Sequence, residues 1–165
     1  MTTMTSVTTQ VYRVYIKASP QAIWDAITDP SWTERYGYGG RIDYDLTPGG
    51  RIVGYTPLDQ VAQGAPEIAL DGEVVECDPP RRLVHTWSLV MAPEIAKEGF
   101  TRLTYEIEPI EGAGTRLTVT HDVDGAPLTA GLMAGGWESS GGGGGWPWIL
   151  SDLKSLLETG SRLGG

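Results

Sequence analysis

The sequence predicts an α+β fold with a mostly antiparallel sheet of about seven strands, two short helices after the first strand and one long C-terminal helix. Three observations support this prediction. Apolar and polar residues alternate with a period of two along seven segments. Turn residues, as in TPGG and EGAG, separate several of these segments. Near the C-terminus the apolar period changes to that of a helix.

The N-terminal part reads as a strand followed by two short helices. Residues 10–18 alternate and are rich in β-branched and aromatic side chains, which is typical of a strand. Ser19 then suits the N-cap position of a helix, with Pro20 at its first turn. We expect this helix to stop at Asp29-Pro30 and a second short helix to follow over residues 31–36.

The middle of the chain reads as six consecutive strands. Two of these strand pairs are joined by short turns and are predicted to form hairpins. Sequential strands are usually neighbours, so the sheet should be mostly antiparallel. The predicted strands cover residues 41–46, 51–56, 67–78, 82–91, 100–110 and 115–123.

The last element is a helix predicted from about Pro147 to Thr159, with Gly160 as its C-terminal cap. Its apolar residues form one stripe, and burying six such side chains contributes roughly 9–18 kcal/mol before entropy is counted. We therefore expect the helix to lie on the sheet. The stripe consists of Trp146, Ile149, Leu150, Leu153, Leu156 and Leu157.

Composition narrows the function classes. The 165 residues predict a single domain, with a flexible N-terminus over 1–8 and a flexible tail over 161–165. A net charge of −9 argues against nucleic acid and membrane surfaces as partners. Cys77 is the only cysteine, which excludes an intrachain disulfide. With no signal-peptide pattern and no long apolar run, we expect a cytoplasmic protein without membrane insertion.

Four segments resemble motifs of the SRPBCC superfamily, also called START-like or birch-pollen-allergen-like: IKASPQAIWDAITDPSW, DPPRRLVHTW, GTRLTVTH and GWPWILSDLKSLLETG. The chain is most similar to the bacterial branch related to the activator of the ninety-kilodalton heat-shock chaperone's ATPase. The resemblance spans residues 10–160. It implies a helix-grip fold, in which a curved antiparallel sheet wraps around one long C-terminal helix and a cavity lies between the two. Members of the superfamily include lipid carriers, aromatase/cyclases and chaperone activators, so the fold alone does not select a function.

The resemblance implies that the chain binds a small hydrophobic or aromatic molecule between the sheet and the C-terminal helix. Two alternatives stay open: a cyclase- or dehydratase-like enzyme, which we consider the weaker interpretation, and a chaperone-regulating interaction domain. We expect no cofactor and no metal, and a homodimer is possible. The candidate ligand-binding residues are Trp24, Tyr36, Tyr38, Tyr55, His85, Trp87, Tyr105, His121, Trp137, Trp146 and Leu150.

Strand parity places both histidines of the chain on inward faces, His85 with Trp87 and His121 with Val119. Three interpretations stay open. The histidines can act on a ligand or as acid and base, with Tyr105 beside His121 or Glu76 beside His85. They can be metal ligands, although a third ligand is missing. They can also be core residues with satisfied hydrogen bonds.

The glycine run from Gly141 to Gly145 precedes the last helix, within a glycine-rich loop over residues 135–145. The family pattern has one Gly-Trp at this place, whereas this chain has two, and we match the family tryptophan to Trp146. A phosphate-binding loop is disfavoured because no Lys-Ser/Thr pair follows. Five glycines favour a hinge. The hypothesis is that this hinge lets Trp137 close over the cavity, and a surface insertion without a role is the alternative.

Overall fold

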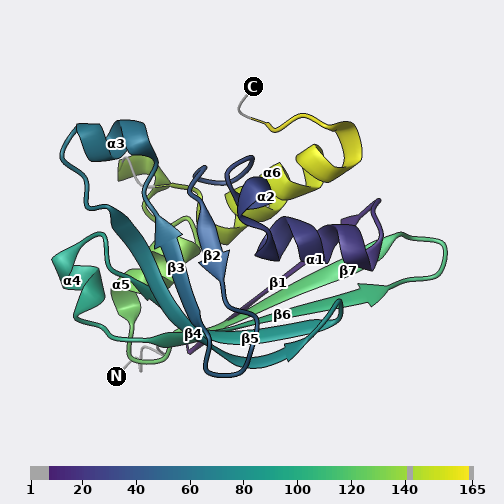
Figure 1. The fold of residues 1–165 in the computed structure, drawn as a ribbon, viewed down its shortest axis with the longest axis horizontal. Coiled ribbons are helices and arrows are strands. Elements are labelled where there is room, and N and C mark those ends of the chain that lie inside the picture. The colour runs from purple at the N-terminus through teal and green to yellow at the C-terminus, as the bar shows by residue number, and fades with distance from the viewer. Residues whose placement is uncertain (1–7, 141–142, 164–165) are drawn as a thin grey trace, which may run out of the picture.

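The computed structural model describes residues 8–140 and 143–163, which form one seven-stranded antiparallel sheet with helices on one side (Figure 1). Helices α1, α2 and α6 lie together over the curved sheet, and α3, α4 and α5 gather at one end of the molecule. This arrangement confirms the predicted α+β fold class. The elements in chain order are β1 (Thr9–Ile16), α1 (Pro20–Thr28), α2 (Pro30–Thr33), β2 (Ile42–Tyr44), β3 (Arg51–Tyr55), α3 (Leu58–Ala62), β4 (Ile68–Asp78), β5 (Arg82–Leu89), α4 (Pro93–Ala96), β6 (Thr101–Pro109), β7 (Thr115–Asp122), α5 (Pro127–Met133), the 3-10 helix η1 (Glu138–Ser140) and α6 (Gly145–Thr159).

The strand order in the sheet is β1-β7-β6-β5-β4-β3-β2. Strands β2 to β7 follow one another as antiparallel neighbours, as the turn signals predicted. Strand β1 instead pairs with β7, with Thr9 opposite Asp122 and Ile16 opposite Thr115. The first and last strands of the chain, β1 and β7, are thus paired. Helix α1 follows β1 and leads toward β2, at the opposite edge of the sheet.

The predicted start of α1 is confirmed in detail. The Ser19 hydroxyl accepts a hydrogen bond from the Ala22 amide at 3.1 Å, and Pro20 occupies the first helical position. Asp29 then serves both helices. Its amide donates to the Asp25 carbonyl at the end of α1, and its carboxylate accepts from the Ser31 amide at the start of α2.

Helix α6 packs on the sheet through the predicted apolar stripe. Its buried residues include Trp146, Leu150, Leu153 and Leu156, while Ile149 is only half-buried. The helix begins at Gly145, two residues before the predicted start, and Gly160 caps it in a left-handed conformation as predicted. Facing residues from β5, β6 and β7 complete the core, among them Leu83, Leu103, Ile107, Leu117 and Val119.

Three short helices were not predicted: α3, α4 and α5. They have five, four and seven residues, too few to show a helical period in the sequence. Helix α5 depends on a distant residue, because the Glu98 carboxylate accepts hydrogen bonds from the Leu128 and Thr129 amides at 2.8 Å. A cap supplied from 30 residues away leaves no local signal.

Close packing accounts for the glycines just before α6. Gly145 has φ +66°, and a side chain there would collide with the carbonyl of Met133 at the end of α5. A side chain on Gly144 would meet Trp148, and one on Gly143 would meet the Tyr38 ring. Gly141 and Gly142 lie outside the described residues, as do residues 1–7 of the expected flexible N-terminus and residues 164–165 of the expected tail.

We predict that Gly145→Ala destabilises the fold more than Gly160→Ala. Both glycines have positive φ, which costs an alanine about 1–2 kcal/mol, but nothing lies within contact distance of a side chain at Gly160. The collision with Met133 should add about 1–3 kcal/mol at Gly145. Urea unfolding of the two variants measures this difference. Equal losses would show that packing does not constrain the start of α6.

Candidate functional site

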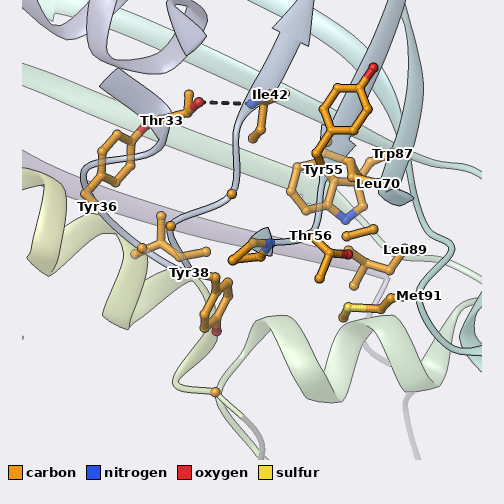
Figure 2. Close-up of a pocket in the computed structure, with 18 of the residues that line it drawn as sticks. Thr33, Tyr36, Tyr38, Ile42, Tyr55, Thr56, Leu70, Trp87, Leu89 and Met91 are labelled. Carbon is orange, nitrogen blue, oxygen red and sulfur yellow. Dashed lines mark hydrogen bonds between the residues drawn. The ribbon is translucent and has the colours of Figure 1, made fainter. Parts of the chain in front are cut away.

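A pocket of about 580 Å³ lies where the loop after α2, the ends of β3 and β5, helix α5 and the start of α6 meet (Figure 2). Aromatic and aliphatic side chains make up most of its wall. The lining residues are Ile27, Thr33, Tyr36, Gly37, Tyr38, Gly39, Gly40, Ile42, Tyr44, Gly54, Tyr55, Thr56, Pro57, Gln60, Ala65, Pro66, Ala69, Leu70, Trp87, Leu89, Met91, Tyr105, Leu132, Met133, Gly143, Trp146 and Ile149.

The structure separates the sequence-predicted site residues into two groups. The lining of the pocket includes Tyr36, Tyr38, Tyr55, Trp87, Tyr105 and Trp146. The other candidates lie elsewhere: Trp24, His85, His121 and Leu150 are buried in the core, and Trp137 is partly exposed and lies against Gly131 of α5. On α6, Ile149 lines the pocket together with Trp146, whereas the neighbouring Leu150 does not.

Several lining residues escaped the sequence analysis. Tyr44 lies on the same face of its predicted strand as Ile42, and both line the pocket. Strand parity could therefore have identified Tyr44 as an inward residue. Leu132 and Met133 belong to α5, a helix that was not predicted, and no local pattern points to them. Thr56 follows β3 directly and lines the pocket as a buried residue.

His121 is a fully buried member of a hydrogen-bond chain that joins α6 to the sheet. The indole N–H of Trp146 donates to His121 Nδ1 at 3.1 Å, so Nδ1 must carry no proton. His121 Nε2 then donates to Thr101 Oγ1 at 2.8 Å. The Thr101 hydroxyl in turn donates to the Trp87 carbonyl at 2.9 Å. Both ring nitrogens are satisfied, and burial lowers the pKa of His121 to about 4.

His85 is also fully buried, behind the pocket wall. Its Nδ1 donates to the Thr86 carbonyl at 2.8 Å, and its ring lies 5.9 Å from the rings of Tyr44 and Tyr105. Nε2 has no partner among the described residues. Burial lowers the pKa of His85 to about 4, so this imidazole is neutral at pH 7.

The two proton-transfer pairs considered from sequence do not form. A β-bulge between Val74 and Glu76 shifts the register of β4, which puts Glu76 opposite Val84. Glu76 is exposed there and forms an ion pair with Arg82 at 3.1 Å. The pairing of Glu76 with His85 was therefore wrong.

Tyr105 and His121 also bind different neighbours. The Tyr105 ring contacts His85 and Trp146, with centroids 5.9 and 6.2 Å away. Both ring nitrogens of His121 are taken by Trp146 and Thr101. Tyr105 lies opposite Val119 in the sheet, one position along the inward face from His121. The two side chains thus make no hydrogen bond to each other.

Three tyrosines gather on the inner side of the pocket. The Tyr36 hydroxyl donates to the Ala26 carbonyl at 2.8 Å. The hydroxyls of Tyr44 and Tyr105 form no hydrogen bond to the described residues. Burial raises the pKa of all three phenols, and their proximity to one another raises the pKa of Tyr105 further. They are neutral hydrogen-bond groups at physiological pH.

The rim loop, residues 36–40, is held against α6 at two points. The Tyr38 hydroxyl accepts from the Gly145 amide at 2.9 Å. The fully buried Asp152 carboxylate accepts from the Gly37 amide at 2.8 Å and from Arg162 at 3.0 Å. Arg162 also donates to the Gly37 carbonyl. Residues 162 and 163 of the tail that we expected to be flexible are thus tied to the helix, because the Leu163 amide binds Asp152 as well.

The family model described as "Activator of Hsp90 ATPase homolog 1-like protein" matches residues 17–158. The chain belongs to this family. The match confirms the resemblance to the SRPBCC superfamily found from the sequence motifs. None of the curated proteins matches the chain.

Solved structures share the fold of this family member at low sequence identity. A protein from Mesorhizobium loti is 23% identical with a TM-score of 0.66, and the match covers 90% of this chain and 96% of that chain. An Aha1 dimer from Colwellia psychrerythraea is 21% identical with a TM-score of 0.64, covering 93% and 98%. DynU16, a protein in the dynemicin biosynthetic locus, is 21% identical with a TM-score of 0.67, covering 95% and 49%.

Charged groups are missing from the pocket of this family member. None of the described lining residues is Asp, Glu, Lys, Arg or His. Within residues 8–140 and 143–163, no three side chains of His, Cys, Asp or Glu come close enough together to hold a metal ion. Over the same ranges, no helix has the length and apolar character to cross a membrane.

We predict that His121 makes stability fall in acid. Its pKa is about 4 in the folded protein and about 6.5 when unfolded, so the unfolded state binds more protons between these values. Stability is complete above about pH 6.5 and is lost as the pH falls toward 4. His121→Gln keeps an acceptor for Trp146 and a donor for Thr101 but does not titrate.

Urea unfolding at pH 7 and pH 4.5 tests this prediction. The wild type should lose about 2 kcal/mol more than His121→Gln between the two conditions. His85 is present in both proteins, so the difference between them reports the titration of His121 together with its coupling to His85. Equal losses would contradict the role given to His121.

Proposed function

We propose that the chain binds a small hydrophobic or aromatic molecule in the pocket beside α6. The pocket itself is the observation that carries this proposal. Its volume of about 580 Å³ falls in the range of about 300–1,000 Å³ that ligand sites occupy. Trp87, Tyr105 and Trp146 supply contact area, as does the aliphatic side chain of Leu89.

A fixed rim supports the same proposal. The hydrogen bonds from Gly37 to Asp152 and from Gly145 to Tyr38 hold the rim loop in place through the protein's own groups. A preformed wall reduces the conformational entropy that binding must overcome. The pocket therefore has the geometry of a site that accepts a ligand without large rearrangement.

An enzymatic function of the cyclase or dehydratase type is the main alternative. Such a reaction needs a group that takes up a proton, and the described lining offers only neutral hydroxyls, an amide and indoles. Both histidines are withdrawn into the core with lowered pKa values. These observations favour binding over proton-transfer catalysis.

The family name suggests a second alternative, the regulation of a chaperone through a surface contact. This function does not use the pocket, so a pocket-filling substitution would leave it intact.

Self-association is a further part of the proposal, supported by the Colwellia psychrerythraea structure, which is described as a dimer. Light scattering on the purified protein measures it.

Native mass spectrometry tests the proposed function. We expect freshly purified protein to carry an added mass that disappears when the same sample is denatured. Leu89→Trp places an indole in the pocket and should abolish this added mass. Val11→Trp, which adds the same group at an exposed position of β1, should keep it. An added mass that both variants retain would place the ligand elsewhere.

A further inference from the structure

Two tyrosine hydroxyls on the inner wall of the pocket, those of Tyr44 and Tyr105, are free to bind a ligand. The other hydroxyls of the inner wall and rim are occupied: Thr33 accepts from the Ile42 amide, Tyr36 binds a carbonyl of α1, and Tyr38 binds the start of α6. Figure 2 shows the Thr33 bond as a dashed line. The hydroxyls of Tyr44 and Tyr105 line the pocket and form no hydrogen bond to the described residues.

Other polar atoms of the lining are less available. The Thr56 hydroxyl and the Trp87 indole N–H also lack partners among the described residues, but both atoms are sealed from solvent. Gln60 is exposed at the mouth. In Figure 2 the Tyr55 hydroxyl points away from the other lining side chains, and Arg41 lies over the Tyr55 ring at 4.5 Å.

Tyr44 and Tyr105 come from opposite parts of the sheet, β2 and β6, and meet at His85. Each phenol ring lies 5.9 Å from the His85 ring, so this buried imidazole packs against both. Tyr105 is buried, and the ring of Trp146 lies edge-on at 6.2 Å. Three strands and α6 thus fix the two rings against the same imidazole, and the Tyr44 phenol lies close enough to Tyr105 to raise its pKa.

The chemistry of this pair selects among apolar ligands. A buried neutral phenol donates a hydrogen bond, and a carbonyl oxygen has two lone pairs to accept two donors. A carboxylate would lose its hydration in a pocket whose described lining has no cation, in a chain with a net charge of −9. A pure hydrocarbon would leave both hydroxyls without a partner.

Resting on the proposed function, we propose that the pocket selects an uncharged aromatic or polycyclic carbonyl compound whose carbonyl oxygen accepts hydrogen bonds from Tyr44 and Tyr105. The same pair discriminates against the hydrocarbon of equal shape and against the corresponding carboxylate. His85 acts only as a positioning residue, because it touches both rings and does not line the pocket.

Three tricyclic probes of matched shape test this inference: fluorenone, fluorene and fluorenecarboxylate. Equilibrium dialysis gives a dissociation constant for each. The wild type should bind fluorenone about tenfold more tightly than fluorene, as expected for two neutral hydrogen bonds, and fluorenecarboxylate most weakly. Tyr44→Phe and Tyr105→Phe should each reduce the preference for fluorenone and leave the affinity for fluorene unchanged or higher.

Tyr55→Phe is the matched control, because it removes a lining hydroxyl that points away from the pocket. It should leave all three constants unchanged. Unchanged fluorene binding in the two test variants shows that their pockets are intact.

The outcomes separate the two proposals. Equal affinity of the wild type for fluorene and fluorenone, an unchanged preference in both test variants, or tightest binding of the carboxylate would each overturn the inference while the proposed function stands. Binding of none of the probes would count against the proposed function and the inference together.

Discussion

The hydrogen bond from Trp146 to His121 is the contact on which the rest of the arrangement depends. It joins the first turn of α6 to β7 inside the core, where an unpaired indole N–H would be costly. This series of hydrogen bonds continues from His121 to Thr101 and from Thr101 to the backbone of β5. One sequence of three hydrogen bonds therefore fixes the helix against three strands.

The pocket follows from this attachment of the helix. With the start of α6 held in place, Trp146 forms one wall, Gly145 holds Tyr38, and Asp152 holds the rim loop. Both ring nitrogens of His121 are occupied by structural hydrogen bonds, to Trp146 and Thr101. Neither histidine lines the pocket. The site that remains is apolar, with hydroxyl groups as its polar element, which suits recognition of a neutral molecule better than proton transfer.

Local patterns predicted the elements well, because each depends on neighbouring residues. Alternation placed the strands, Ser19 and Asp29 marked the helix ends, and strand parity correctly put His85 and His121 inside. The cross-strand pairing of Glu76 with His85 was wrong, since a β-bulge between Val74 and Glu76 shifts the register and puts Glu76 opposite Val84. Helix α5 was missed because its cap, Glu98, comes from another part of the chain.

The sequence by itself determined the fold class, the apolar stripe of α6 and the family, since periodicity and motifs are written in residues close together along the chain. Only the tertiary structure decided which aromatic residues face the pocket. Three strands, β3, β4 and β5, separate Tyr44 from Tyr105 along the chain, and the two side chains line one pocket only because the sheet curves around α6. Likewise, the partner of each His121 nitrogen depends on long-range packing, so no local pattern distinguishes a structural histidine from a catalytic one.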